Sequence, residues 1–93
     1  MARRRNILEI YAKILEIGLK GATKTQVVYG ANLNFKRLDQ YVNQLSRRGL
    51  IKVEQSDGGR VTITTSDVGR KFLTEYRRFR EIFERMVKEY TPS

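Results

Sequence analysis

Residues 34–49 read NFKRLDQYVNQLSRRG, and this stretch decides how the rest of the chain is interpreted. Its apolar residues recur at helical spacing, which predicts a helix with one buried stripe. That stripe consists of Phe35, Leu38, Val42 and Leu45. Asn34 is a good N-cap, and Gly49 tolerates the left-handed conformation that ends many helices. The predicted outward face carries Lys36, Arg37, Gln40, Asn43, Gln44 and Arg47.

Cationic and amide side chains on one capped helix are typical of a recognition helix. On an isolated helix, the same face would more often be a solvated surface that keeps the protein in solution. The sequence around the helix therefore has to distinguish the two interpretations.

Two helices are predicted before this stretch. The first spans about Arg4 to Lys20 and ends at Gly21, with Gly18 as the alternative end. Its apolar face consists of Ile7, Ile10, Tyr11, Ile14, Leu15 and Leu19. The second spans about Lys24 to Gly30, and the segment TKTQ at residues 23–26 matches a capping box at its start.

A four-residue turn, GANL at residues 30–33, separates the second predicted helix from the third. Asn32 is the residue in it best able to adopt a positive φ angle. Two helices joined by such a turn form the helix-turn-helix arrangement.

After Gly49 the apolar period changes from 3.6 to 2, which indicates strands. Ile51, Val53 and Gln55 share one face of the first strand, and Val61 and Ile63 share one face of the second. Between them, SDGG at residues 56–59 supplies turn residues for a β-hairpin. Three helices followed by a hairpin is the winged-helix order. Arg60 lies where a wing would meet a phosphate, although a strand-end arginine is more often simply solvated.

The last predicted helix runs from Asp67 to Tyr90, with Ser66 as its N-cap. Aromatic and apolar residues follow a 4-3-4-3-4 spacing along it, which is a heptad seam. We predict a dimer interface made of Phe72, Tyr76, Phe79, Ile82, Phe83, Met86, Val87 and Tyr90. Phe72 and the neighbouring Leu73 are expected to pack on the chain's own core. From Tyr76 onward, a partner chain is the better explanation, because a helix of roughly 36 Å is too long for this chain to cover.

Composition indicates a polyanionic partner. The 93 residues include 19 Lys and Arg against 10 Asp and Glu, giving a formal charge of +9 and a pI near 10.3. Residues 1–65 carry a net +7, with twelve basic and five acidic side chains, and residues 66–93 carry +2. The N-terminal arm contains Arg4 and Arg5, which could lie along phosphates or simply form a charged end.

The same composition argues against enzymatic chemistry and membrane insertion. The chain has no Cys and no His, so the commonest metal ligands and general base are missing. No apolar run approaches the roughly 20 residues of a membrane span. We expect a cytoplasmic, nucleoid-associated protein with no enzymatic activity, no cofactor, no metal site and no small-molecule substrate.

The chain resembles the archaeal winged-helix family of small Sulfolobus DNA-binding proteins. The resemblance rests on GATKTQVVYGANLNF at residues 21–35, on Leu38, Tyr41 and Leu45, on GLI at 49–51 and on SDVGRKFL at 66–73. Gly18 is a departure from the pattern. The resemblance implies a homodimer joined by an antiparallel coiled coil of the last helices. It also implies DNA binding in chromatin organisation or transcription regulation.

The predicted fold class is therefore mainly α with a small β-hairpin, with a winged helix-turn-helix domain at 1–65 and a coiled-coil dimerisation helix at 66–93. The predicted ligand is double-stranded DNA. The residues assigned to DNA are Arg4, Arg5, Lys24, Asn34, Lys36, Arg37, Gln40, Asn43, Gln44, Arg47 and Arg60. The alternatives are a protein-interaction module, and RNA binding, for which stacking aromatics on the basic face are not evident.

Overall fold

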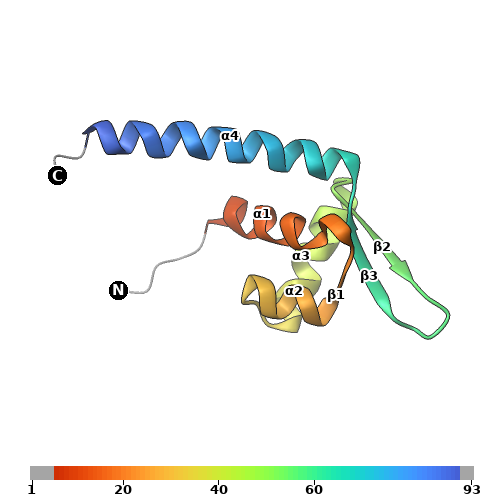
Figure 1. The fold of residues 1–93 in the computed structure, drawn as a ribbon. Coiled ribbons are helices and arrows are strands. Elements are labelled where there is room, and N and C mark those ends of the chain that lie inside the picture. Colours follow the sequence, from red (N-terminus) through yellow and green to blue (C-terminus); the bar gives the residue numbers. More distant parts are fainter. Residues whose placement is uncertain (1–5, 91–93) are drawn as a thin grey trace.

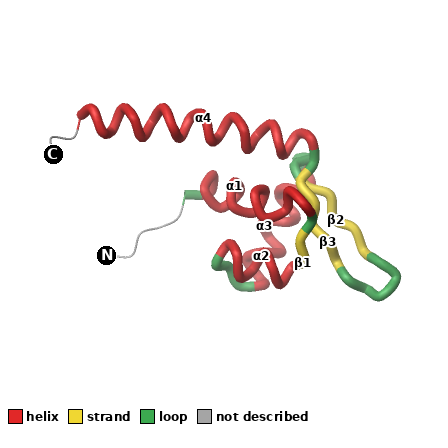
Figure 2. Tube along the Cα trace, viewed as in Figure 1, coloured by secondary structure: helices red, strands yellow, loops and turns green. Residues whose placement is uncertain are grey.

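A computed structural model describes residues 6–90 of the chain, with the side chain of residue 90 left out of the description. The elements in chain order are α1 (Ile7–Ile17), the 3₁₀ turn η1 (Gly18–Lys20), β1 (Ala22–Thr23), α2 (Lys24–Ala31), α3 (Phe35–Arg47), β2 (Ile51–Gln55), β3 (Val61–Thr65) and α4 (Asp67–Tyr90). The expected fold class is confirmed: a mainly helical winged helix with a small sheet and a long last helix (Figure 1, Figure 2).

The helices begin where their capping residues dictate. Asn34 Oδ1 accepts a hydrogen bond from the N–H of Arg37 at 2.7 Å, and Ser66 Oγ accepts one from the N–H of Gly69 at 3.1 Å. Thr23 and Gln26 form the predicted capping box at the start of α2. Each cap satisfies backbone donors that the first turn of a helix leaves unpaired. The predicted starts of α2, α3 and α4 are therefore confirmed.

The first helix is shorter than predicted. Its α-helical part begins after the N-cap Asn6 and ends at Ile17, after which η1 carries the chain to Gly21. Gly18 has a packing reason, because a Cβ atom there would lie 2.9 Å from Thr65 Oγ1. The Thr65 hydroxyl in turn donates to the carbonyl of Leu15 at 2.7 Å. Close contact with β3, and not only a weak helix end, explains this glycine.

The sheet has three strands in the order β1-β3-β2, all antiparallel. The hairpin is the predicted one, with Val53 opposite Ile63. Strand β1 was not predicted; it pairs with β3, with Ala22 opposite Ile63. Two residues are too few to show an alternating pattern, so no periodicity could have predicted this strand.

A single core lies between the three helices, the sheet and the start of α4. Its largest fully buried side chains are Ile14, Leu15, Leu38, Leu45, Ile63 and Val27. Three predicted core positions are wrong: Ile7 is 50% exposed, Phe35 52% and Val53 43%. Each lies at an end of its element or out along the hairpin, where no second layer covers it.

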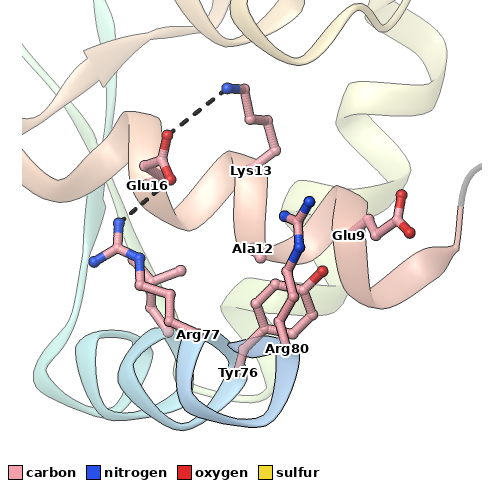
Figure 3. Close-up of a pocket in the computed structure, with 8 residues that line it drawn as sticks. Glu9, Ala12, Lys13, Glu16, Tyr76, Arg77 and Arg80 are labelled. Carbon is pink, nitrogen blue, oxygen red and sulfur yellow. Dashed lines mark hydrogen bonds and ion pairs between the residues drawn. The ribbon is translucent and has the colours of Figure 1, made fainter. Parts of the chain in front are cut away.

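The long helix α4 lies alongside α1 and then extends beyond it (Figure 1). Leu73 is buried in the core, and Phe72 and Tyr76 pack against it in part. Tyr76 therefore belongs partly to the chain's own core, and the exposed part of the seam begins one turn later, at Phe79. Figure 3 shows Glu16 of α1 between Lys13 and Arg77, and the Arg77 Nη2 to Glu16 Oε2 distance is 3.3 Å.

Candidate nucleic-acid interface

The outward side of α3 carries a continuous polar stripe. Its members are exposed and recur four, three and four residues apart, so they share one side of the helix. We call the four residues Lys36, Gln40, Asn43 and Arg47 the α3 stripe. Two cations at the ends and two amides between them provide donors for phosphates and for base edges. The stripe lies opposite the buried residues Leu38, Val42 and Leu45.

Arg37 and Gln44 lie beside this stripe, on the margin that faces α1. The Arg37 Nη2 donates to the Tyr41 hydroxyl at 3.2 Å, and its Cζ lies 5.9 Å from the centroid of that ring. The Tyr11 hydroxyl donates to Gln44 Oε1. Tyr11 and Tyr41 meet edge to face, with ring centroids 6.1 Å apart. This network holds Arg37 while leaving it exposed, and it occupies one polar atom of Gln44.

Two further predicted residues are engaged within the fold. Lys24 Nζ lies 2.9 Å from Asp39 Oδ1, which joins the start of α2 to α3. The Asn34 side chain is used as the cap of α3. Asp39 was not predicted to matter, yet it is an exposed carboxylate beside the α3 stripe that holds a candidate phosphate-binding lysine. An acidic residue within a basic recognition helix was the available signal.

The hairpin of β2 and β3 projects from the rest of the chain (Figure 1). Its tip is closed by hydrogen bonds from the N–H of Ser56 to the Arg60 carbonyl and from the N–H of Gly59 to the Ser56 carbonyl, both at 2.9 Å. Gly59 has a φ of +80°, which explains the second glycine of the turn. Arg60 is exposed at this tip, and Arg4 and Arg5 lie outside the described residues.

A second exposed surface is apolar and follows α4. Phe79 is 64% exposed, and Phe79 and Phe83 stack with centroids 6.2 Å apart. The other large exposed apolar side chains on its C-terminal half are Ile82, Met86 and Val87.

This surface continues into a groove of about 480 Å³, which we call the α4 groove. The lining comprises Leu8, Leu50, Val68, Lys71, Phe72, Glu75, Tyr76 and Phe79. Heptad spacing did not point to Leu8, Leu50 or Val68, because these residues lie outside the seam or on other elements. A large apolar surface of this kind marks an interaction site.

Four charged residues of α4 form ion pairs along the helix itself. Arg80 Nε lies 3.0 Å from Glu84 Oε1, and Arg85 Nη2 lies 3.0 Å from Glu81 Oε1. The hydrogen bond to Glu84 and the charge of that carboxylate raise the pKa of Arg80. Such pairs four residues apart support a helix that has little tertiary contact.

Within residues 6–90, no three acidic, His or Cys side chains gather in a way that could bind a metal ion. None of the helices in that range is both long and apolar enough to cross a membrane. The polar cleft between α1 and α4 is lined by residues of both signs, and the ion pair of Glu16 with Arg77 joins the two helices across it (Figure 3).

A basic helix-turn-helix with a hairpin wing defines a class, and comparison with known proteins assigns the chain to it. The chain belongs to the winged helix-turn-helix family, whose sequence profile matches residues 4–84. Among curated protein sequences, none matches this chain.

Three solved structures illustrate the shared fold. The crystal structure of Sso10a-2, a DNA-binding protein from Sulfolobus solfataricus, superposes with a TM-score of 0.81 at 24% identity, covering 91% of this chain and 88% of that chain. The transcriptional regulator BldR, also from Sulfolobus solfataricus, gives 0.75 at 15% identity, covering 86% and 60%. A mutant of MepR from S. aureus, bound to an oligodeoxyribonucleotide, gives 0.70 at 12% identity, covering 92% and 64%. The resemblance to small Sulfolobus winged-helix proteins is thus confirmed at the level of family and fold.

Proposed function

We propose that this protein binds double-stranded DNA as a homodimer and acts in nucleoid organisation or transcription regulation. The observation that carries the proposal is the α3 stripe, an exposed row of two cations and two amides on the helix that follows the helix-turn-helix turn. Charge adds to it, since residues 1–65 carry a net +7. A basic surface of this kind attracts the polyanionic duplex before any base is contacted.

In the proposed complex, α3 enters the major groove and the hairpin lies along the adjacent backbone. Lys36 and Arg47, at the two ends of the stripe, contact phosphates or guanine, and Gln40 and Asn43 face base edges. Arg60 contacts the backbone from the hairpin tip. Most of the affinity then comes from phosphates and is independent of sequence, while the amides add a smaller preference for particular bases.

We further propose that α4 joins two copies into a dimer. The large apolar side chains of Phe79, Ile82, Phe83 and Met86 support this, because each is more than half exposed. In this proposal residues 1–65 form the DNA-binding head and residues 66–93 the dimerisation helix, although the first turns of α4 also pack on the head.

The α4 groove favours an antiparallel pairing. If the two helices cross near residue 81, the partner's last turns lie beside Phe72 and Tyr76, and the partner's Met86 faces the groove. In a parallel pair, the last turns of the two helices would pack against each other. The groove of each copy would then face the first turns of its partner's α4. Arg80 is already neutralised by Glu84 in its own helix, so the approach of two copies of Arg80 near the centre costs little. Antiparallel pairing also separates the two net-positive heads beyond a Debye length of about 8 Å.

The DNA proposal is tested by removing two cations from the α3 stripe. A Lys36→Ala/Arg47→Ala variant should lose at least about tenfold in duplex affinity at low salt, since each phosphate contact contributes a slope of about −0.9. An Arg78→Ala/Lys88→Ala variant removes the same charge from α4 and is the matched control. Equal losses in both variants would mean that overall charge, and not this face, binds the duplex. Absence of duplex binding by the unaltered protein would favour the protein-interaction module.

The pairing is tested by a distance measurement between two copies of one label. The chain contains no cysteine, so Lys88→Cys provides a single labelling site. Antiparallel pairing about residue 81 separates the two labels by roughly 21 Å along the helix axis, at about 1.5 Å per residue. Parallel pairing would leave no separation along the helix axis, with the two axes about 8–10 Å apart.

A further inference from the structure

Phe35 is an aromatic residue that lies outside the core, at the N-terminal end of α3. It is the first residue of α3, and 52% of it is exposed. Leu33 and Leu38 occupy the positions that a hydrophobic staple uses at a helix start, and both belong to the core or pack against it. The ring of Phe35 is therefore not required to fix the entry of the chain into α3.

Neither of the aromatic pairs identified within residues 6–90 uses Phe35. Tyr11 pairs with Tyr41, and Phe79 with Phe83. The guanidinium of Arg37 lies over Tyr41. An exposed phenylalanine in a first helical turn also gains little from helix propensity. The ring therefore contributes little to stability and is available to contact a ligand of α3.

The position of Phe35 on α3 suggests where that ligand lies. At about 100° per residue, Phe35 lies between the buried Val42 and the exposed Asp39, at the edge of the exposed side of α3, and Asp39 separates it from the α3 stripe. Lys36, the first member of the stripe, is its immediate neighbour in the sequence. In helix-turn-helix proteins, the N-terminal residues of the recognition helix are the ones that approach base edges.

We propose that the ring of Phe35 contacts the C5-methyl group of thymine in the major groove. This inference rests on the proposed function, because it requires α3 to enter that groove. The thymine methyl is the apolar feature of the major-groove edges, and phenylalanine is one of the side chains that contact it. Lys36 and the amides of the stripe are suited to phosphates and polar edges. Phe35 would thus add a preference for A·T-containing sites to binding that is otherwise electrostatic.

The test is a double-mutant cycle, in which one change removes the methyl group from the DNA and the other removes the ring from the protein. Two duplexes of identical sequence are compared, one with thymine and one with deoxyuridine, which lacks only the C5-methyl. The unaltered protein should bind the thymine duplex more tightly, because burying one carbon group contributes about 0.8 kcal/mol. The expected ratio of affinities is about 4-fold for one methyl contact in one head and about 16-fold for one contact in each head of a dimer. Phe35→Ala should bind both duplexes equally, with unchanged helicity because the ring is largely outside the core.

Lys36→Ala is the matched control. It should weaken binding to both duplexes by the same factor and keep their ratio, since it removes a charge and no apolar contact. With a C·G pair placed at the position of the contacted thymine, 5-methylcytosine should be preferred over cytosine, because its methyl group occupies the same ring position as that of thymine.

The inference is overturned if the unaltered protein does not distinguish thymine from deoxyuridine, or if Phe35→Ala keeps the full difference. In the latter case, the effect arises from DNA shape or another residue. Either result leaves duplex binding itself intact, whereas failure to bind any duplex would contradict the proposed function.

Discussion

Asp39→Asn should strengthen DNA binding, and the structure gives the size of the effect. Asp39 is the carboxylate on α3 that holds Lys24 Nζ at 2.9 Å. Its neutralisation removes one negative charge from each head and releases one lysine for a phosphate. If each head gains about one contact, the slope of log affinity against log salt steepens by about 0.9 per head. If the variant and the unaltered protein bind equally at about 1 M salt, the variant binds roughly eightfold more tightly per head at about 0.1 M salt.

The free energy of unfolding of Asp39→Asn should stay the same or fall slightly. The Lys24 and Asp39 side chains are 38% and 60% exposed, and an ion pair this open contributes less than about 1 kcal/mol after solvent screening. The substitution therefore separates binding from stability, since the first should increase while the second stays level or falls. Fluorescence anisotropy on one duplex at about 50 and 200 mM salt measures the affinity and the salt slope. Thermal unfolding measures the stability.

The matched control is Glu81→Gln, which removes one carboxylate from the exposed side of α4 and releases Arg85 from its ion pair. It should change duplex affinity much less than Asp39→Asn, because α4 is not expected to approach DNA. Unchanged or weaker binding by Asp39→Asn would refute the reasoning, since it would mean that Lys24 does not reach a phosphate or that this side of α3 faces away from the duplex.

Three other predictions concern single positions. Arg37→Ala should weaken duplex binding by about 1–3 kcal/mol if Arg37 makes a bidentate base contact and by less if it contacts phosphate; unaltered affinity would mean that its margin of α3 is only solvated. Phe79→Asp, at an exposed seam position, should give monomers in sedimentation and much weaker DNA binding, since the second head loses its effective concentration; an unchanged dimer would exclude α4 as the interface. Gly69→Ala should lower the free energy of unfolding by about 1–3 kcal/mol in a thermal melt, because the added Cβ would lie 2.2 Å from the Leu50 carbonyl oxygen. Gly58→Ala, where a Cβ meets nothing within 4 Å, is its control, and equal stability of the two variants would contradict the packing argument.

Local signals accounted for the features of the fold that were predicted well. The caps at Thr23, Asn34 and Ser66 set the starts of three helices, and each acts on backbone groups only three residues away. Gly49, with a φ of +74°, follows the end of α3 as its sequence position indicated. Helix caps and turn glycines depend only on residues a few positions away in the chain, so a local sequence pattern is enough to predict them.

What the sequence could not supply depends on distant partners. Phe35 has apolar character and helical spacing, but it precedes the turn of α3 that the core covers, and only the packed structure shows it exposed. Gln44 was assigned outward, yet it accepts a hydrogen bond from Tyr11, 33 residues away. Lys24 and Asp39 are likewise brought together from two helices. The sequence therefore predicted which residues are candidates for the site. It did not predict which of them form the α3 stripe, which form an ion pair and which are held by hydrogen bonds to tyrosines.

The most direct test of duplex binding by two basic heads is the salt dependence of affinity for the unaltered protein. If each head of the dimer neutralises about four phosphates, log affinity should fall against log salt with a slope near −7, at about −0.9 per contact. A slope shallower than about −2, or no binding to duplex DNA at low salt, would contradict the account.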